Sequence, residues 1–218
     1  MEYKNCGQPT KIHNTTLYNC DCMELLKETP DKYYELAIVD PPYGIKINMN
    51  MGRRKGERKK HKDKQWDNSV PNDEYFQELY RVSKNQIIWG GNYFRLPLTK
   101  SWIFWDKDVP EGVSFADGEL AWTSFDKTLV KIRLPYSGFR GSEGKIHPTQ
   151  KPVALYKWLL KNYAKEGDKI LDTHLGSMSI AIACHYMGFE LTGCELDKEY
   201  FDAGVERVTN QTRQQTLI

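Results

Sequence analysis

The sequence predicts an α/β fold with a doubly wound, mainly parallel sheet. Short apolar runs without alternation, such as 35–39, are typical of strands buried on both faces. These runs alternate along the chain with segments of helical period, which is the order of a parallel sheet wound by helices. The chain has 218 residues, about 1.5 times a common domain length. We therefore expect one domain, 1–218, that carries an insertion.

The first half of the chain is expected to form strands and helices around one rigid turn. The run 35–39 stops at Asp40-Pro41-Pro42-Tyr43, because proline continues neither a strand nor a helix. Asp40 should therefore lie at the carboxyl end of a central strand. A helix over 72–82 is indicated by apolar side chains spaced i, i+1, i+4 and i+5. The other expected elements are strands over 15–21, 85–89 and 101–105 and a short helix over 22–28.

The second half begins with a change of character. Residues 106–146 contain short alternating pieces and loop signals, which predict a small β-rich or irregular insertion. A regular α/β pattern returns from residue 150. Its expected elements are a helix bearing Tyr156, Leu159, Leu160 and Tyr163, a strand over 168–172, a helix over 177–187, a strand over 189–195 and a helix over 198–209.

The net charge of +2 conceals an uneven distribution. Residues 52–64 hold eight Lys or Arg against two acidic residues, so this strip carries +6 and the rest of the chain −4. The strip lies in 44–71, for which we expect a basic, flexible loop. Such a strip contacts nucleic acid or another polyanion, or it is simply a solvated loop. The basic residues proposed as nucleic-acid contacts are Arg53, Arg54, Lys55, Arg58, Lys59 and Lys60.

The cysteines and the apolar runs indicate the cellular compartment of the protein. No Cys-x-x-Cys pair and no signal-like leader is present, which indicates free thiols in the cytoplasm and no metal site. An alternative is that Cys20 and Cys22 share a strand face and bind a metal. No run approaches the ~18 apolar residues of a membrane helix, so no membrane role is expected. The cysteines are Cys6, Cys20, Cys22, Cys184 and Cys194.

Asp40-Pro41-Pro42-Tyr43 presents a carboxylate, a backbone carbonyl and an aromatic ring on one rigid turn. These groups suit an exocyclic amine on a flat base. Asp40 and the Pro41 carbonyl can each accept an N–H hydrogen bond, which favours a pyramidal nitrogen in the transition state. Tyr43 can stack on the base. The alternative is a plain Asp-Pro turn that closes a strand.

A second segment joins the strand ending at Asp172 to a helix. The Gly176-Ser177 turn allows close approach of a ligand, and the helix N-terminus offers amide donors. Glu195 ends the next strand and can accept hydrogen bonds from ribose hydroxyls, as in dinucleotide folds. This spacing is also that of a nicotinamide enzyme, and Asp197 can equally be a helix cap.

The segment VDPPYG resembles the catalytic motif of amino-group DNA methyltransferases that use S-adenosylmethionine. The stretch from Asp172 resembles the family pattern Asp-Pro-Phe-x-Gly-Ser-Gly, with departures at Thr173, His174 and Met178. The segment His147-Pro148-Thr149-Gln150-Lys151-Pro152 and the triplet Cys20-Asp21-Cys22 resemble two further family segments. The amine motif precedes the cofactor motif, as in the circularly permuted β arrangement of this Rossmann-like fold. Compact phage and mobile-element enzymes are the most similar members.

The resemblance implies the roles of the site residues. Asp40, Pro41, Pro42 and Tyr43 would carry catalysis without a metal. S-adenosylmethionine, which leaves as S-adenosylhomocysteine, would be bound by Asp21, Cys22, Asp40, His147, Thr149, Lys151, Asp172, Leu175, Gly176, Ser177, Glu195 and Leu196. Residues 106–146 would recognise the target site in double-stranded DNA. Candidate contacts there and beside it are Trp105, Trp122, Arg133 and Arg140. A restriction endonuclease partner and a homodimer are further expectations of the resemblance.

A leading Asp goes mainly with adenine N6 in this family, and a leading Ser with cytosine N4. Carbon-5 cytosine methylation is disfavoured, because no cysteine follows a proline. The alternatives that stay open are transfer to cytosine N4, to RNA adenine or to a glutamine side chain. A DNA-binding module without activity and an NAD-binding enzyme are also open.

Overall fold

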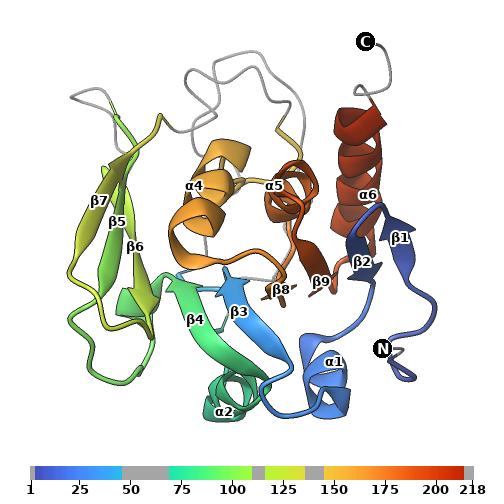
Figure 1. Cartoon of the computed structure of the whole chain (residues 1–218), viewed down its shortest axis with the longest axis horizontal. Coiled ribbons are helices and arrows are strands. Elements are labelled where there is room, and N and C mark those ends of the chain that lie inside the picture. Colours follow the sequence, from blue (N-terminus) through green and yellow to red (C-terminus); the bar gives the residue numbers. More distant parts are fainter. Residues whose placement is uncertain (1–2, 46–68, 110–115, 136–144, 214–218) are drawn as a thin grey trace.

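The computed structural model describes residues 3–45, 69–109, 116–135 and 145–213. In these residues one mixed sheet of nine strands runs through the molecule in the order β1-β2-β9-β8-β3-β4-β6-β5-β7 (Figure 1). The five neighbours from β2 to β4 are mutually parallel. The strands are β1 (Thr10–Ile12), β2 (Thr15–Tyr18), β3 (Tyr34–Val39), β4 (Ser83–Trp89), β5 (Trp102–Asp106), β6 (Gly118–Thr123), β7 (Val130–Arg133), β8 (Lys169–Asp172) and β9 (Glu190–Cys194).

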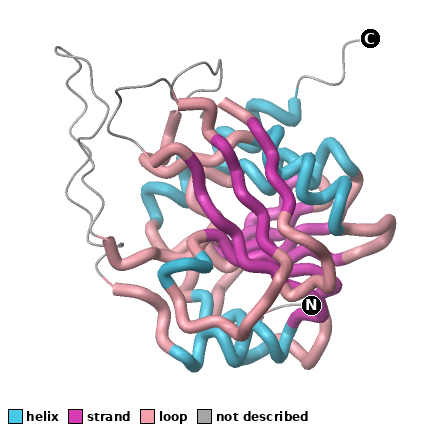
Figure 2. The backbone as a smooth tube through the Cα atoms, turned by 90° about the vertical axis from the view of Figure 1, so that its left-hand side faces the viewer, coloured by secondary structure: helices cyan, strands magenta, loops and turns pink. Residues whose placement is uncertain are grey.

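Helices cover both faces of the sheet, as Figure 2 shows from the side. The central strand β3 sends Leu36 and Ile38 into a core that also contains the buried side chains of three of the helices. Ala37 and Val39 point into a second core with the two others. The first core is covered by α4 (Val153–Tyr163), α5 (Ser179–Met187) and α6 (Lys198–Thr212), and the second by α1 (Cys22–Glu28) and α2 (Asp73–Val82). The doubly wound, mainly parallel α/β fold is therefore confirmed.

The central elements agree with the sequence prediction, and the differences lie at their ends. The first predicted strand ends at Tyr18, before Asp21 caps α1. Helix α5 begins at Ser179 and not at 177, because Met178 has left-handed backbone. The sequence does not predict the edge strand β1. From the predicted insertion, β6 and β7 join the main sheet, and β6 pairs with β4 and β5.

The expectation of free cysteines is wrong for one pair. Cys6 and Cys20 form a disulfide across 14 residues of chain. The pairing depends on a Cα separation of 5.1 Å, which tertiary structure sets and cysteine spacing does not reveal. Cys20 lies in this bond and Cys22 opens α1, so the two do not share a strand face as the metal alternative required.

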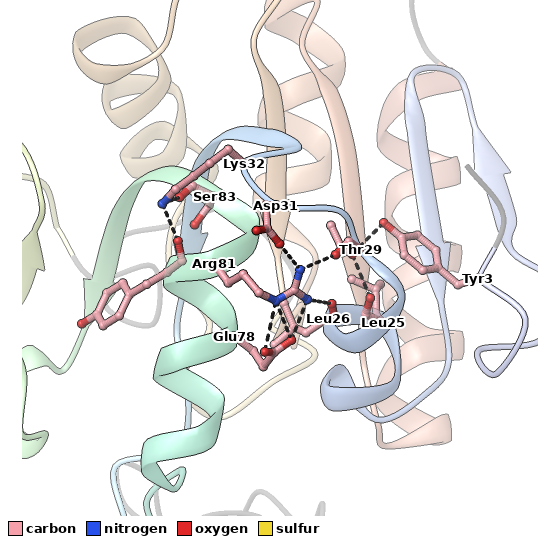
Figure 3. A network of polar contacts seen from close by, with 10 residues as sticks. Tyr3, Leu25, Leu26, Thr29, Asp31, Lys32, Glu78, Arg81 and Ser83 are labelled. Atoms are coloured by element: carbon pink, nitrogen blue, oxygen red, sulfur yellow. Dashed lines mark hydrogen bonds and ion pairs between the residues drawn. The ribbon is translucent and has the colours of Figure 1, made fainter.

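Arg81 ties the two helices of the second face together (Figure 3). Its guanidinium donates to the carbonyls of Leu26 and Thr29 at the end of α1, at 2.8 and 2.7 Å. It also pairs with Glu78 on its own helix and with Asp31. These contacts fix the end of α1 against α2. Among the described residues, none of the helices has the length and apolar character needed to cross a membrane.

Candidate active site

Asp40 is the first residue after β3 and lies where the parallel strands end. Its carboxylate is mostly buried, and both oxygens receive hydrogen bonds. The Tyr43 hydroxyl donates to Oδ1 at 2.6 Å, and the Lys151 ammonium donates to Oδ2 at 2.5 Å. Lys151 comes from the loop before α4, 111 residues away. The fold therefore brings the Asp40-Pro41-Pro42-Tyr43 turn together with the segment 147–152.

Lys151 is enclosed by acidic and aromatic groups. Its side chain is 2% exposed, and its ammonium also pairs with Glu119 on β6 at 3.0 Å. The same ammonium lies 5.2 Å from the ring centre of Trp89 at the end of β4. Glu119 pairs in turn with Lys107 at 2.6 Å. Two carboxylates and two ammonium groups thus form one mostly buried, charge-balanced cluster.

The charges of this cluster depend on each other. Burial raises the pKa of Asp40, Lys151 opposes that rise, and Glu119 adds to it, so the net shift is upward. Burial also raises the pKa of Glu119, but Lys151 and Lys107 outweigh it and bring the value to about 2. Burial lowers the pKa of Lys151, but Asp40 and Glu119 raise it by more. The net shift is upward, so the ammonium stays charged. Asp40 is therefore the carboxylate of this pair that protonates first on acidification.

The ring of Tyr43 is held by its surroundings. It stacks on Tyr93 with 5.0 Å between ring centres and 13° between planes. Gly90, at φ +67, lies against the same ring, and a Cβ there would come within 2.2 Å of it. Glycine is therefore required at this position both for its left-handed backbone and for space. Burial raises the pKa of the Tyr43 hydroxyl well above its usual value, so this group remains a donor.

The loop from Asp172 to Met178 joins β8 to α5. Asp172 is buried, which raises its pKa to about 8, and its Oδ1 accepts the His174 amide at 2.9 Å. Glu195, just after β9, accepts the Gly176 amide at 2.8 Å. Leu196 follows it with 70% of its surface exposed. A loop of backbone amides, a carboxylate and an exposed apolar side chain therefore lie together at the ends of β8 and β9.

The departures from the family pattern occupy structural positions. Thr173 shares a hydrogen bond of 2.7 Å with the Tyr75 hydroxyl, and the His174 ring contacts the same tyrosine edge-on. Burial lowers the pKa of His174 to about 4, so it is a neutral packing residue. Met178 is fully buried against Gly204 of α6. These three residues support the loop through their contacts with α2 and α6.

The remaining cofactor candidates lie at the borders of this loop. His147 packs against Gly176, where an added Cβ would lie 3.7 Å from the imidazole ring. Thr149 shares a hydrogen bond with His147 at 3.1 Å. Asp21 caps α1 by accepting the Met23 amide at 2.8 Å. Ser177 and Leu175 are mostly buried in the loop itself, and burial raises the pKa of Cys22 to about 12.

The candidate DNA contacts divide into three groups. Trp105 and Trp122 are buried, and their indole N–H groups donate to the carbonyls of Leu134 and Pro97, so these two are structural. Arg133 on β7 is exposed and pairs with Asp106 at 2.9 Å. The others lie outside the described residues: Arg53, Arg54, Lys55, Arg58, Lys59, Lys60 and Arg140.

The sequence prediction missed Glu119 and Lys107. The signal that could have drawn attention to Glu119 is an acidic residue directly before the apolar run Leu120-Ala121-Trp122. A charged group at the start of a buried strand needs a partner. Its partner, Lys151, is identifiable only once β6 is seen beside β4.

Comparison with known proteins points to the same family as the sequence motifs. The family model for DNA methylases matches residues 97–206, which is half of the chain. The type II methyltransferase M.HpaI of Haemophilus parainfluenzae is 25% identical over 236 residues, covering 88% of this chain and 73% of that protein. M.HinfI of Haemophilus influenzae is 26% identical over 243 residues, covering 88% and 68%.

Solved structures show the same fold. The M1.HpyAVI–SAM complex matches with a TM-score of 0.60 at 20% identity and covers 89% of this chain and 98% of that one. The cytosine-N4-specific PvuII DNA methyltransferase matches with a TM-score of 0.63 at 15% identity and covers 96% of each. These likenesses establish a Rossmann-like methyltransferase fold. With the family match and the amine motif at the end of β3, they show that this chain belongs to the DNA methylase family.

Proposed function

We propose that this chain is a site-specific DNA methyltransferase that methylates adenine N6 in duplex DNA, with S-adenosylmethionine as methyl donor. The observation that carries the proposal is the Asp40 carboxylate at the end of β3. It is held on a Pro-Pro turn beside Tyr43, and both of its oxygens accept hydrogen bonds. An acceptor in this position suits an N–H of the target amine. The leading Asp favours adenine, by the family tendency.

S-adenosylmethionine would supply a methyl group on a sulfonium, from which an amine can displace the sulfur. The residues of this chain have the task of making the amine nucleophilic. Asp40 and the Pro41 carbonyl would each accept one N–H, which favours the pyramidal nitrogen whose lone pair attacks. Asp40 is also placed to receive a proton from the methylated nitrogen. Tyr43 would stack on the base and recover about 1–3 kcal/mol of the cost of flipping it.

The residues at the ends of β8 and β9 fit this methyl donor. The Gly176 loop presents backbone amides near a helix N-terminus, which suits a carboxylate. Glu195 would accept hydrogen bonds from the ribose hydroxyls, and the exposed Leu196 would lie against the adenine. Asp21 borders the same region from the start of α1. His147, Thr149 and Lys151 would approach the methionine end.

We propose two DNA contacts outside this centre. The segment 44–71, which carries the basic residues, begins directly after Tyr43, and this suits contact with phosphates near a flipped base. Residues 106–146 outside β6, including Arg133, would recognise the target sequence, since β6 itself lies within the main sheet between β4 and β5. A restriction endonuclease partner, a homodimer and a cytoplasmic location stay predictions.

The test is mass spectrometry of nucleosides from DNA of cells that express the chain, with Asp40→Ala as the matched control. We expect N6-methyladenine above background with the wild-type chain and none with Asp40→Ala. Calorimetry should show that Asp40→Ala binds S-adenosylmethionine within a few-fold of the wild type. Finding N4-methylcytosine instead would show that the chain methylates cytosine N4 and not adenine N6. An active Asp40→Ala variant, or stabilisation by NAD and not by S-adenosylmethionine, would overturn the proposal.

A further inference from the structure

Both oxygens of Asp40 are already committed within the chain. Tyr43 donates to one and Lys151 to the other, at 2.6 and 2.5 Å. A carboxylate can accept about four hydrogen bonds, so the target amine, which the proposed function brings to Asp40, would compete with these two donors for its charge, most of all with the ammonium of Lys151. A buried ammonium left without an acceptor costs several kcal/mol. Lys151 can therefore turn away from Asp40 only if a second acceptor lies close by.

Glu119 is the second acceptor for both donors. Its Oε2 lies 3.0 Å from the Lys151 ammonium and 3.4 Å from the Tyr43 hydroxyl. Its Oε1 lies 2.6 Å from the ammonium of Lys107, which fixes the carboxylate in place. Glu119 stands on β6, whereas Asp40 follows β3, so a rigid sheet sets the separation of the two carboxylates.

We propose that Glu119 is a positioning residue that takes over the hydrogen bonds of Lys151 and Tyr43 when Asp40 turns to the target amine. This inference rests on the proposed function. Lys151 then keeps a buried counter-charge throughout, and Asp40 becomes free to accept the N–H. Lys107 supports this exchange because its ion pair holds the Glu119 carboxylate in place. Glu119 itself does not touch the amine.

The groups around Asp40 give this exchange a signature in pH. Besides Lys151, Tyr43 and Glu119, the Asp40 carboxylate faces Tyr156 on α4 and Asp172 at the end of β8. Glu119 contributes to the upward shift in the pKa of Asp40. In Glu119→Gln that contribution disappears, so the pKa of Asp40 falls. Lys151 loses its alternative charged partner and remains on Asp40.

The test compares Glu119→Gln with Glu190→Gln, the same substitution at an exposed position on β9. At saturating DNA and S-adenosylmethionine, we expect kcat of Glu119→Gln to fall roughly tenfold to a hundredfold, from the loss of one charged hydrogen-bond partner. The acid limb of its pH profile should move to lower pH, and cofactor affinity should stay within about threefold. Glu190→Gln should match the wild type in all three. A purely structural loss would lower kcat without moving the limb.

Two further measurements keep the inference falsifiable. Lys151→Gln should cost less activity in Glu119→Gln than in the wild type, because the trapped ammonium is gone. The Asp40 carboxyl, followed by carbon-13 NMR, should titrate at lower pH in Glu119→Gln even if no DNA is methylated. Additive losses, or an unmoved carboxyl titration, would overturn the role of Glu119. Absence of methylated base with the wild-type chain would overturn the proposed function alone.

Discussion

Met178 and Gly204 contact each other, so the effect of Gly204→Ala on stability should change sign when Met178 is replaced by glycine. Met178 has φ +58 and ψ 27, the left-handed conformation, and its side chain is fully buried. Gly204 lies opposite on α6, and a Cβ there would come within 2.7 Å of Met178 Cγ and Sδ. A non-glycine residue in this conformation costs about 1–2 kcal/mol. The family pattern has glycine where this chain has Met178.

The magnitudes follow from these contacts. Gly204→Ala gains about 0.8–1.0 kcal/mol of helix propensity but meets the thioether, and overpacking costs about 1–3 kcal/mol. The net change in the wild type is a loss of up to about 2 kcal/mol. Met178→Gly removes the backbone strain but also a buried side chain worth about 2–5 kcal/mol. In that background the collision is absent, so Gly204→Ala should stabilise by about 1 kcal/mol.

Urea denaturation of the four proteins in the cycle measures this coupling. We expect an interaction energy of about 1–3 kcal/mol between the two positions. In thermal unfolding, each kcal/mol should correspond to about 2–4 °C for a chain of this size. Ala203→Gly, on the same helix, is the control and should cost the same in both backgrounds. If Gly204→Ala changed stability equally in the wild type and in the Met178→Gly background, within about 0.5 kcal/mol, the packing argument would be refuted.

Three other predictions concern charge and the disulfide. The pKa of Asp172 is raised to about 8, so as pH rises from about 4 to about 8 the unfolded chain loses this proton first and the fold is destabilised. Asp172→Asn should therefore stabilise the fold more at about pH 8 than at about pH 5, measured by urea denaturation. Reducing the Cys6–Cys20 bond opens a loop whose closure is worth about 3 kcal/mol, so reductant should lower Tm in the wild type and in Cys22→Ser but not in Cys20→Ser. Neutralising four basic residues of the strip should reduce the slope of log Kd for DNA against log salt by up to about 3.6. The four residues are Arg53, Arg54, Lys59 and Lys60. An unchanged slope would show that the strip does not contact DNA phosphates.

The elements that the sequence predicts well are those whose own residues determine them. The apolar run 35–39 forms β3, and the stripe over 72–82 forms α2, with Asn72 as its cap. Both rest on local patterns of burial and capping. The turn at Asp40 is predictable for the same reason, because two prolines end a strand wherever it lies.

The parts that the sequence does not predict depend on contacts between distant segments. Glu119 is 79 residues from Asp40, and only the place of β6 between β4 and β5 brings it to the site. The alternating pattern there predicts a strand but not which sheet edge the strand joins. The family resemblance places Lys151 at the methyl donor, and the structure shows it paired with Asp40 and Glu119. Ion pairs of this kind follow from topology and not from local spacing.

The departures from the cofactor pattern show how a motif can change and keep its geometry. Thr173 and His174 stand where the family pattern has Pro and Phe. Both contact Tyr75 of α2, so this helix supports the loop. Arg207 of α6 donates to the Ser177 carbonyl at 2.6 Å, so the turn is also held from the helix that faces it. Met178 keeps the left-handed backbone that glycine would adopt, and the space for its side chain comes from a glycine on α6. The motif is thus a backbone shape with supporting partners, and a chain with a large residue at this position is expected to carry a small one on the facing helix.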